Sequence, residues 1–219
     1  MAEPHLGCDT DDLLMIHAVF RHAFAKAPEL VEQANPEDQA RVAQVAGIIQ
    51  EGLIALHEHH GNEDRVLWQL LAERAPEQRA DVERMKLEHA DIAASITAVE
   101  TLLTAWRAAP AQKTELVDAL RRFSQEVVRH LDDEEASVKP LAARVLQQSE
   151  WNRLREGGVP QIPKDRLLFH LGYLMHCSPS PALRQEFWHA LPLPVRLMYR
   201  LFGERKFEQE WQSLFGEKL

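Results

Sequence analysis

Two segments of the chain share one spacing of histidine and glutamate: His59-His60-Gly61-Asn62-Glu63-Asp64 and, 71 residues later, His130-Leu131-Asp132-Asp133-Glu134-Glu135. In an α-helix, residues four apart lie on one face, so each segment presents an imidazole and a carboxylate to the same point. Both groups are common metal ligands. The spacing therefore predicts a helix at each segment with a metal-binding pair on it.

Each segment also follows another histidine at a similar distance. His17 lies 42 residues before His59, and His89 lies 41 residues before His130. Beyond the pairs the correspondence continues with the aligned positions Asp64/Glu135, Leu67/Val138, Leu70/Leu141 and Ala72/Ala143. We interpret the chain as a duplicated helical hairpin.

Hydrophobic periodicity predicts an all-α protein, because apolar residues recur at helical spacing and glycine is scarce. We expect one helix from Thr10 to about Ala27, before Pro28, and a second capped by Asn35 whose apolar stripe continues past Glu63 as Val66, Leu67 and Leu70. Two more are expected from about 77 to 108 and from about 112 onward. Joined by short connections, they make an up-down-up-down four-helix bundle over residues 10–148.

The last third of the chain has a different composition. Residues 149–219 hold ten of the fifteen aromatic residues and half of the twelve prolines. We expect a C-terminal helical extension, with helices beginning near Ser149, Pro163, Pro181 and Leu193, that packs on the bundle or dimerises. A basic cluster, diluted by nearby glutamates, is interpreted as a solvated helix face rather than a phosphate-binding patch: Arg196, Arg200, Arg205 and Lys206.

The bulk composition narrows the class of protein. The chain has 219 residues, a net charge of −9 and two cysteines, Cys8 and Cys177. We find no secretory leader and no apolar run near the length of a membrane span, and therefore expect a soluble, cytoplasmic protein with no membrane partner. The acidic surface disfavours nucleic acid as a partner. A monomer and a homodimer are both open.

The four predicted bundle helices each carry at least one ligand-type residue on the apolar face: His17, His59 with Glu63, His89, and His130 with Glu134. Two buried carboxylates close together cost several kcal/mol each unless a positive charge lies between them. A pair of divalent ions meets this need. Nitrogen and oxygen donors suit iron, our first choice, although manganese and zinc share these ligand types.

With these six residues at this spacing, residues 10–148 resemble the hemerythrin-like, or HHE cation-binding, domain in its His, His-x-x-x-Glu, His, His-x-x-x-Glu variant. The resemblance implies a di-iron centre with an oxo or hydroxo bridge. It also implies terminal imidazole ligands and bridging carboxylates at the matching positions: His17, His59, His89 and His130, with Glu63 and Glu134. Oxygen-carrying hemerythrins have a further histidine where this chain has Ala93. That difference favours sensing or redox chemistry over oxygen carriage.

Two alternatives concern neighbouring residues. His60 and Asp64 form a second pair at the same spacing, but His60 aligns with Leu131 in the repeat, which argues against this pair as ligands. Asp64 and Glu135 align as carboxylates, so either could bridge the metals or accept a hydrogen bond from a ligand imidazole.

Three functions remain from the sequence. The first is a di-iron protein that binds dioxygen, nitric oxide or peroxide in sensing or a redox stress response. The second is a di-iron oxidoreductase with catalase-like or peroxidase-like activity, and the third is a metal-free helical scaffold. Whether the chain is an enzyme is left open.

Overall fold

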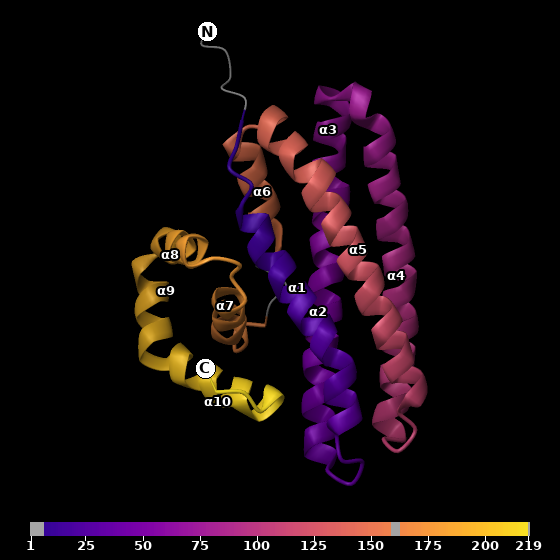
Figure 1. The fold of residues 1–219 in the computed structure, drawn as a ribbon. Coiled ribbons are helices and arrows are strands. Elements are labelled where there is room, and N and C mark those ends of the chain that lie inside the picture. The colour runs from indigo at the N-terminus through magenta and orange to yellow at the C-terminus, as the bar shows by residue number, and fades with distance from the viewer. Residues whose placement is uncertain (1–6, 159–162, 219) are drawn as a thin grey trace.

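The chain folds into four long helices followed by a lobe of shorter ones (Figure 1). The computed structural model describes residues 7–158 and 163–218. The long helices alternate in direction: α1 (Asp12–Gln33), α2 (Gln39–Asn62), α4 (Arg79–Ala108) and α5 (Thr114–Val145). Within the described residues the only β-type pairing is an isolated bridge between Gly7 and Gln147. The predicted all-α, up-down-up-down bundle is confirmed.

The first helix continues beyond its predicted end. The sequence prediction placed the end before Pro28, whereas α1 runs through Pro28 to Gln33. A proline inside a helix costs about 3 kcal/mol because it removes a hydrogen bond and crowds the preceding turn. Burial of Leu30 and Val31 in the core offsets this, since each such side chain contributes about 1.5–3 kcal/mol.

The second helix begins later than predicted. Asn35 does not cap it; its side chain accepts a hydrogen bond from the Glu37 N–H in the preceding turn, at 3.1 Å. The cap is Asp38, whose carboxylate accepts from the Arg41 N–H at 2.9 Å. Both residue types cap helices well, and only the path of the connection selects between them.

A π-helical turn interrupts the second helix just beyond the expected ligands. This turn, η1 (Glu63–Leu67), joins α2 to α3 (Trp68–Arg74), and the Trp68 N–H bonds to the Glu63 carbonyl five residues back. The extra residue in the turn shifts the following side chains by about 100°. Leu67, Trp68 and Leu71 are therefore fully buried, whereas Val66 and Leu70 of the predicted stripe are only half-buried, with Leu70 packed against the edge of the core. A 3₁₀ turn, η2 (Pro76–Gln78), leads into α4.

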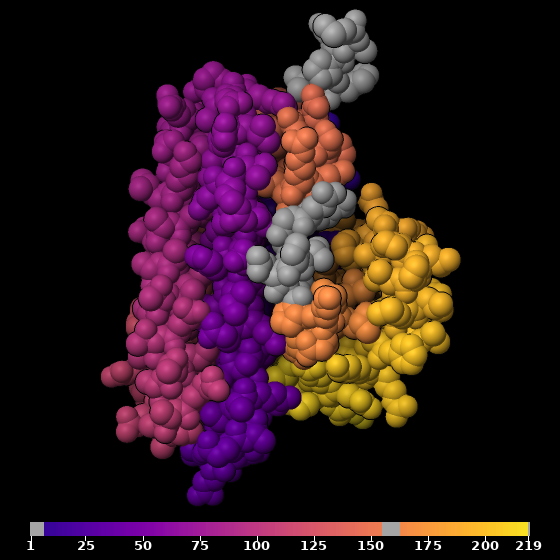
Figure 2. Space-filling model, turned by 180° about the vertical axis from the view of Figure 1, so that it is seen from behind, coloured from indigo at the N-terminus to yellow at the C-terminus, as the bar shows by residue number. Residues whose placement is uncertain are grey.

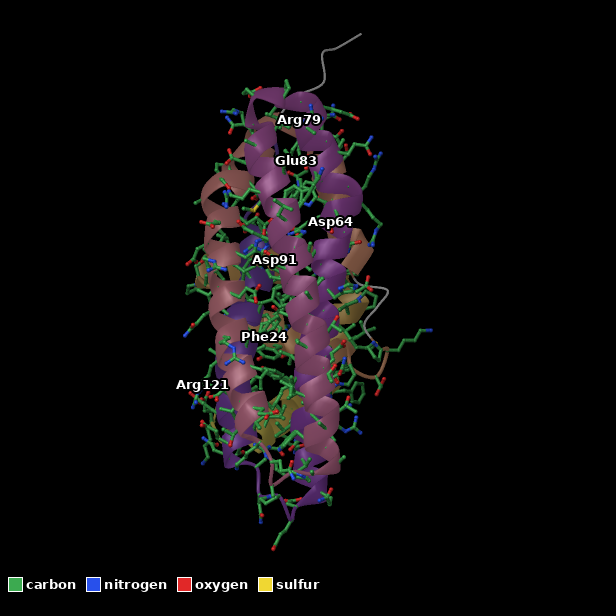
Figure 3. All side chains as sticks on the ribbon, turned by 90° about the vertical axis from the view of Figure 1, so that its right-hand side faces the viewer. Phe24, Asp64, Arg79, Glu83, Asp91 and Arg121 are labelled. Atoms are coloured by element: carbon green, nitrogen blue, oxygen red, sulfur yellow. The ribbon has the colours of Figure 1, made fainter. Side chains whose placement is uncertain are left out.

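Two apolar clusters fill the bundle, and a polar layer separates them. One cluster occupies the half that contains Phe20 and Phe24, and the other the half that contains Trp68 and Met85. Figure 3 places Phe24 in the lower part of the bundle and Asp64 higher up, at the level of the layer. The layer contains the histidines and glutamates on which the sequence analysis centred.

The remaining helices are α6 (Gln148–Gly158), α7 (Leu167–His176), α8 (Pro181–Ala190), α9 (Leu193–Met198) and α10 (Glu204–Phe215), with a π-helical turn η4 (Tyr199–Gly203) between the last two. Four of them begin close to the predicted positions. We call residues 163–218 the C-terminal lobe; Figure 2 shows it on one side of the bundle.

Among the described residues, the close contacts of the C-terminal lobe with the bundle are made to α1 and α2. Arg166 at the start of α7 forms an ion pair with Glu51 of α2 at 2.9 Å, and His170 lies 3.1 Å from the same carboxylate. Arg41 of α2 donates to the carbonyl oxygens of Ser213 and Leu214. Cys8 and Cys177 are free thiols. None of the helices that the structure describes has both the length and the apolar character needed to cross a bilayer.

Candidate metal centre

The polar layer takes one or two side chains from each long helix of the bundle. His17 comes from α1, His59 and His60 from α2, His89 from α4, and His130 and Glu134 from α5, while Glu63 begins the π-helical turn. All are buried except His59, whose side chain is 15 % exposed. The layer thus contains five imidazoles and two carboxylates.

One group of potential metal ligands consists of His17, His59 and Glu134, whose ligand atoms all lie within 4.8 Å of one another. The His17 Nε2 atom is 3.2 Å from Glu134 Oε2. The rings of His17 and His59 are nearly perpendicular, with centroids 5.4 Å apart. Three different helices contribute to this group.

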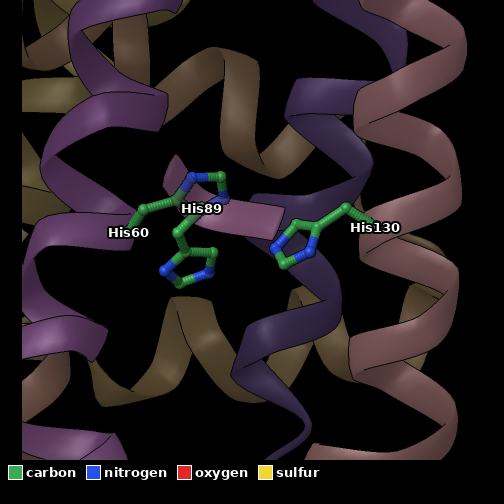
Figure 4. Close-up of side chains that lie close together, drawn as sticks. All are labelled: His60, His89 and His130. Atoms are coloured by element: carbon green, nitrogen blue, oxygen red, sulfur yellow. The ribbon is translucent and has the colours of Figure 1, made fainter. Parts of the chain in front are cut away.

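A second group consists of His60, His89 and His130, again with ligand atoms within 4.8 Å of one another (Figure 4). The rings of His60 and His89 are stacked, with centroids 4.1 Å apart. The His130 ring stands edge-on to both, at 4.9 Å from each.

Glu63 lies between the two groups. Its Oε1 atom is 3.4 Å from His59 Nε2 in the first group, and its Oε2 atom is 3.7 Å from His89 Nε2 in the second. A carboxylate with one oxygen toward each group has the geometry needed to bridge two ions.

The inward-facing polar atoms of this layer have no hydrogen-bond partners. They are the Nε2 atoms of all five histidines, Oε2 of Glu63 and both carboxylate oxygens of Glu134. Each buried polar atom left unpaired costs about 1–3 kcal/mol, and more for a charged group. A bound species that satisfies these atoms would remove this cost, and nitrogen and carboxylate donors together fit a transition-metal cation.

The outward-facing nitrogens of three histidines, in contrast, are paired with carboxylates. Nδ1 of His17 is 2.8 Å from Glu135, Nδ1 of His89 is 2.7 Å from Asp64, and Nδ1 of His130 is 2.8 Å from Glu88. When Nδ1 donates its proton to the carboxylate, Nε2 carries the lone pair and points inward. These contacts therefore set the tautomer that binds a metal.

The carboxylates that hold the imidazoles are themselves anchored. Arg21 donates to Glu135 at 2.8 Å, and Arg84 donates to Glu88 at 2.8 Å. Asp64 accepts from the indole N–H of Trp68 at 2.7 Å. The orientation of each of these three rings is thus fixed by two residues outside the layer.

Burial lowers the pKa of three of the imidazoles. Desolvation, helped by neighbouring imidazoles, lowers the pKa of His59 to about 3 and that of His60 well below its ordinary value. Desolvation and His130 also lower the pKa of His89, although Asp64 opposes the shift. A neutral imidazole is the form that ligates a metal.

The two carboxylates are pushed in opposite directions. Desolvation and the nearby Glu134 raise the pKa of Glu63 well above its ordinary value. Desolvation also acts on Glu134, but His17 outweighs it and lowers the pKa of that carboxyl. At His17 burial favours a lower pKa, but the contacts with Glu134 and Glu135 outweigh it and raise the pKa of the imidazole. Two acids in one buried layer thus ionise together only if more positive charge is present.

The structure brings together all six residues singled out in the sequence, namely His17, His59, Glu63, His89, His130 and Glu134. It adds His60, which the internal repeat had argued against. At the corresponding position of α5 the repeat has the buried Leu131. A usable signal was present: the tandem His59-His60 together with Ala93 at the position of a family ligand. No feature of the sequence indicated that Glu88 contacts the His130 imidazole.

The comparison with known families agrees with this geometry. The family model described as the hemerythrin HHE cation binding domain matches residues 8–142. The chain belongs to the hemerythrin HHE family. No curated protein and no solved structure matched the chain. As a member of this family the chain has a cation-binding domain, and its His/Glu groups are able to hold a metal.

Proposed function

We propose that this hemerythrin HHE protein holds a pair of iron ions in the polar layer and binds a small ligand there, either dioxygen, nitric oxide or peroxide. One ion would be held by His17, His59 and Glu134, and the other by His60, His89 and His130, with Glu63 between them. When bound, the iron pair supplies reversible coordination of a small molecule and one-electron redox chemistry.

The observation that carries the proposal is the set of unpartnered donor atoms. Five imidazole nitrogens and three carboxylate oxygens face one buried layer without a hydrogen bond. A scaffold without metal would be expected to pair these atoms or replace them by apolar residues, since burial of unpaired polar groups is costly. The metal-free reading of the sequence is therefore the least supported of the three.

His60 changes the weight of the functional alternatives. The absence of a ligand at Ala93 favoured sensing or redox chemistry over oxygen carriage. His60 offers a fifth imidazole from another helix, in contact with His89 and His130. A fuller ligand set favours ligand binding over turnover. Compared with ferritin-like centres, which use more glutamates, this set is less negative and suits a neutral ligand.

Ligand access is expected beside His59. Its side chain is 15 % exposed, whereas the side chains of Glu63, His89 and His130 are at most 4 % exposed. The Phe20 ring lies 5.4 Å from His59 and covers the layer on the side of the first apolar cluster. His59 is therefore the most exposed of the seven residues in the layer.

The test begins with protein produced with iron available. Metal analysis and Mössbauer spectroscopy should show iron as a coupled pair, and the visible spectrum should change stably on addition of dioxygen or nitric oxide. Oxygen evolution from hydrogen peroxide in large excess over iron would assign the oxidoreductase function instead. Protein that folds normally and retains no iron would contradict the proposal.

A further inference from the structure

The C-terminal lobe exposes an apolar stripe that the fold does not use. Eight large apolar side chains are well exposed within the described residues, and five of them lie in α9 and η4. Leu193, Leu197, Met198, Leu201 and Phe202 are between 52 % and 69 % exposed. We call these five residues the outer stripe.

The η4 turn and the α10 helix that follows it are packed on their other face, whereas α9 itself has no buried residue. Tyr199, Phe207 and Trp211 are buried against α7, and a Cβ atom at Gly172 would lie 2.5 Å from the Phe207 ring. The close approach of the helices at Gly172 fixes the segment in place. The lobe thus has its own core, and the outer stripe is surplus to it. In Figure 1, α9 lies on the outer side of the lobe, away from the bundle.

The residues around the outer stripe are basic in an otherwise acidic protein. Residues 193–206 contain Arg196, Arg200, Arg205 and Lys206 but only one acid, Glu204, while the whole chain has a net charge of −9. None of these four cations forms an ion pair with another described residue. The guanidinium of Arg200 lies 5.3 Å from the ring of Trp188, a half-buried aromatic residue at the edge of the stripe.

We propose that the outer stripe docks α9 and η4 onto an anionic lipid surface. A helix lying in the interface of a bilayer combines exposed Leu and Phe with flanking Arg and Lys, which match the acyl layer and the anionic headgroups respectively. The sequence has no apolar run near the length of a membrane span, and from it we expected no membrane partner. A helix that lies on the surface requires no such length.

The charges and the apolar residues of this surface argue against two other occupants, a second copy of the chain and a nucleic acid. In a two-fold symmetric dimer the same patch faces itself, so the four cations would approach their own copies. A nucleic acid would satisfy the cations but leave the five apolar side chains in water. Of these three occupants, an anionic lipid surface is the one that satisfies both features.

Vesicle flotation tests the proposal with the full-length, metal-loaded protein. At low salt the protein should float with phosphatidylglycerol vesicles and remain behind with phosphatidylcholine vesicles. The double variant L197E/L201E should lose flotation. The double variant R205Q/K206Q should bind more weakly, by about fivefold for each cation removed, and the wild-type binding should weaken with salt.

The matched control is L87E. Leu87 is 69 % exposed, as much as any residue of the outer stripe, but lies alone on α4. L87E should float like the wild type, and all variants should keep the wild-type helix content. Failure of the wild type to bind phosphatidylglycerol vesicles would overturn the proposal, as would wild-type binding by L197E/L201E. A concentration-dependent dimer that L197E/L201E dissociates, without vesicle binding, would assign the surface to a second copy.

Discussion

The two halves of the bundle, α1 to α3 and α4 to α5, share a pattern but do not perform identical tasks. Residues at equivalent positions of the repeat lie at equivalent places in the two halves. A carboxylate of each half contacts the Nδ1 atom of an imidazole in the other half: Asp64 contacts His89, and Glu135 contacts His17. The halves differ in two respects. His60 of the first half corresponds in sequence to Leu131 of the second, and of the two halves only the first contains a π-helical turn. Only the first half carries the C-terminal lobe.

The difference shows how a near-symmetric scaffold produces two unlike groups of ligands. Each group takes two imidazoles from one half. The third member of the first group is a carboxylate, Glu134, whereas the third member of the second group is an imidazole, His60. If these groups hold metal, the ion beside His60 has a softer, less negative ligand set than the ion beside Glu134.

Removal of Glu63 is expected to have the largest effect. Glu63→Ala takes away a carboxylate that lies beside both groups, so both ions should be lost rather than one. Iron analysis of the purified variant measures this. Retention of a full pair of ions by Glu63→Ala would show that the two groups bind metal independently.

Conversion of His60 to the residue of the other half is the next test. His60→Leu makes the two halves alike at this position and leaves the second group with two imidazoles, so the variant should retain about half of the wild-type iron. His57→Leu on the same helix is the control, because His57 is exposed and should have no effect. Equal iron in both variants would exclude His60 as a ligand.

A double variant tests whether an imidazole on α4 can replace that of His60. In His60→Leu/Ala93→His, an imidazole is placed four residues after His89, on the same face of α4, where oxygen-carrying hemerythrins have their ligand. We expect this variant to regain the iron lost in His60→Leu. Continued loss would indicate that the second group requires a ligand from α2 specifically.

A smaller effect is expected from the carboxylates that hold the imidazoles. Asp64→Asn and Glu135→Gln should each weaken metal binding by about 10–100-fold, because such partners orient the ring and raise its basicity. Competition with a chelator gives the affinities. Unequal losses would locate a functional difference between the halves; Glu135 also pairs with Arg21, whereas Asp64 also pairs with Trp68.

The smallest expected effect concerns the contact between the first half and the C-terminal lobe. Glu51→Gln weakens the pairing with Arg166 and His170 and should lower the free energy of unfolding by about 2 kcal/mol, measured in urea. Burial opposes ionisation of Glu51, but His170 and Arg166 outweigh it and lower its pKa. The wild-type advantage should therefore be full above the ordinary carboxyl pKa and disappear as the pH falls through the lowered value.

A matched substitution in the other half provides the control for this last test. Arg122 stands 71 residues after Glu51 and is exposed on α5, without a lobe against it. Arg122→Gln should leave the free energy of unfolding within about 0.5 kcal/mol of the wild type. A similar loss in both variants would mean that the lobe contact contributes nothing of its own.

Hydrophobic periodicity predicted the helices and their order, and the repeated spacing of histidine and glutamate singled out six residues of the layer. This works because ligand pairs at positions 59/63 and 130/134 depend only on helix geometry, which is local. The boundaries at Pro28 and Asp38 were predicted less well. They depend on the burial of Leu30 and Val31 and on the path of a connection, both of which involve residues distant in the sequence.

The amino-acid sequence by itself determined the duplicated bundle and the chemical character of its interior, because hydrophobic periodicity and the types of potential ligand follow directly from the order of the residues. Only the tertiary structure decided that His60 joins His89 and His130, that Glu63 stands between two groups, and that Asp64 and Glu135 each hold an imidazole of the opposite half. Those relations depend on how four helices are rotated against one another, and packing across the whole core sets that rotation.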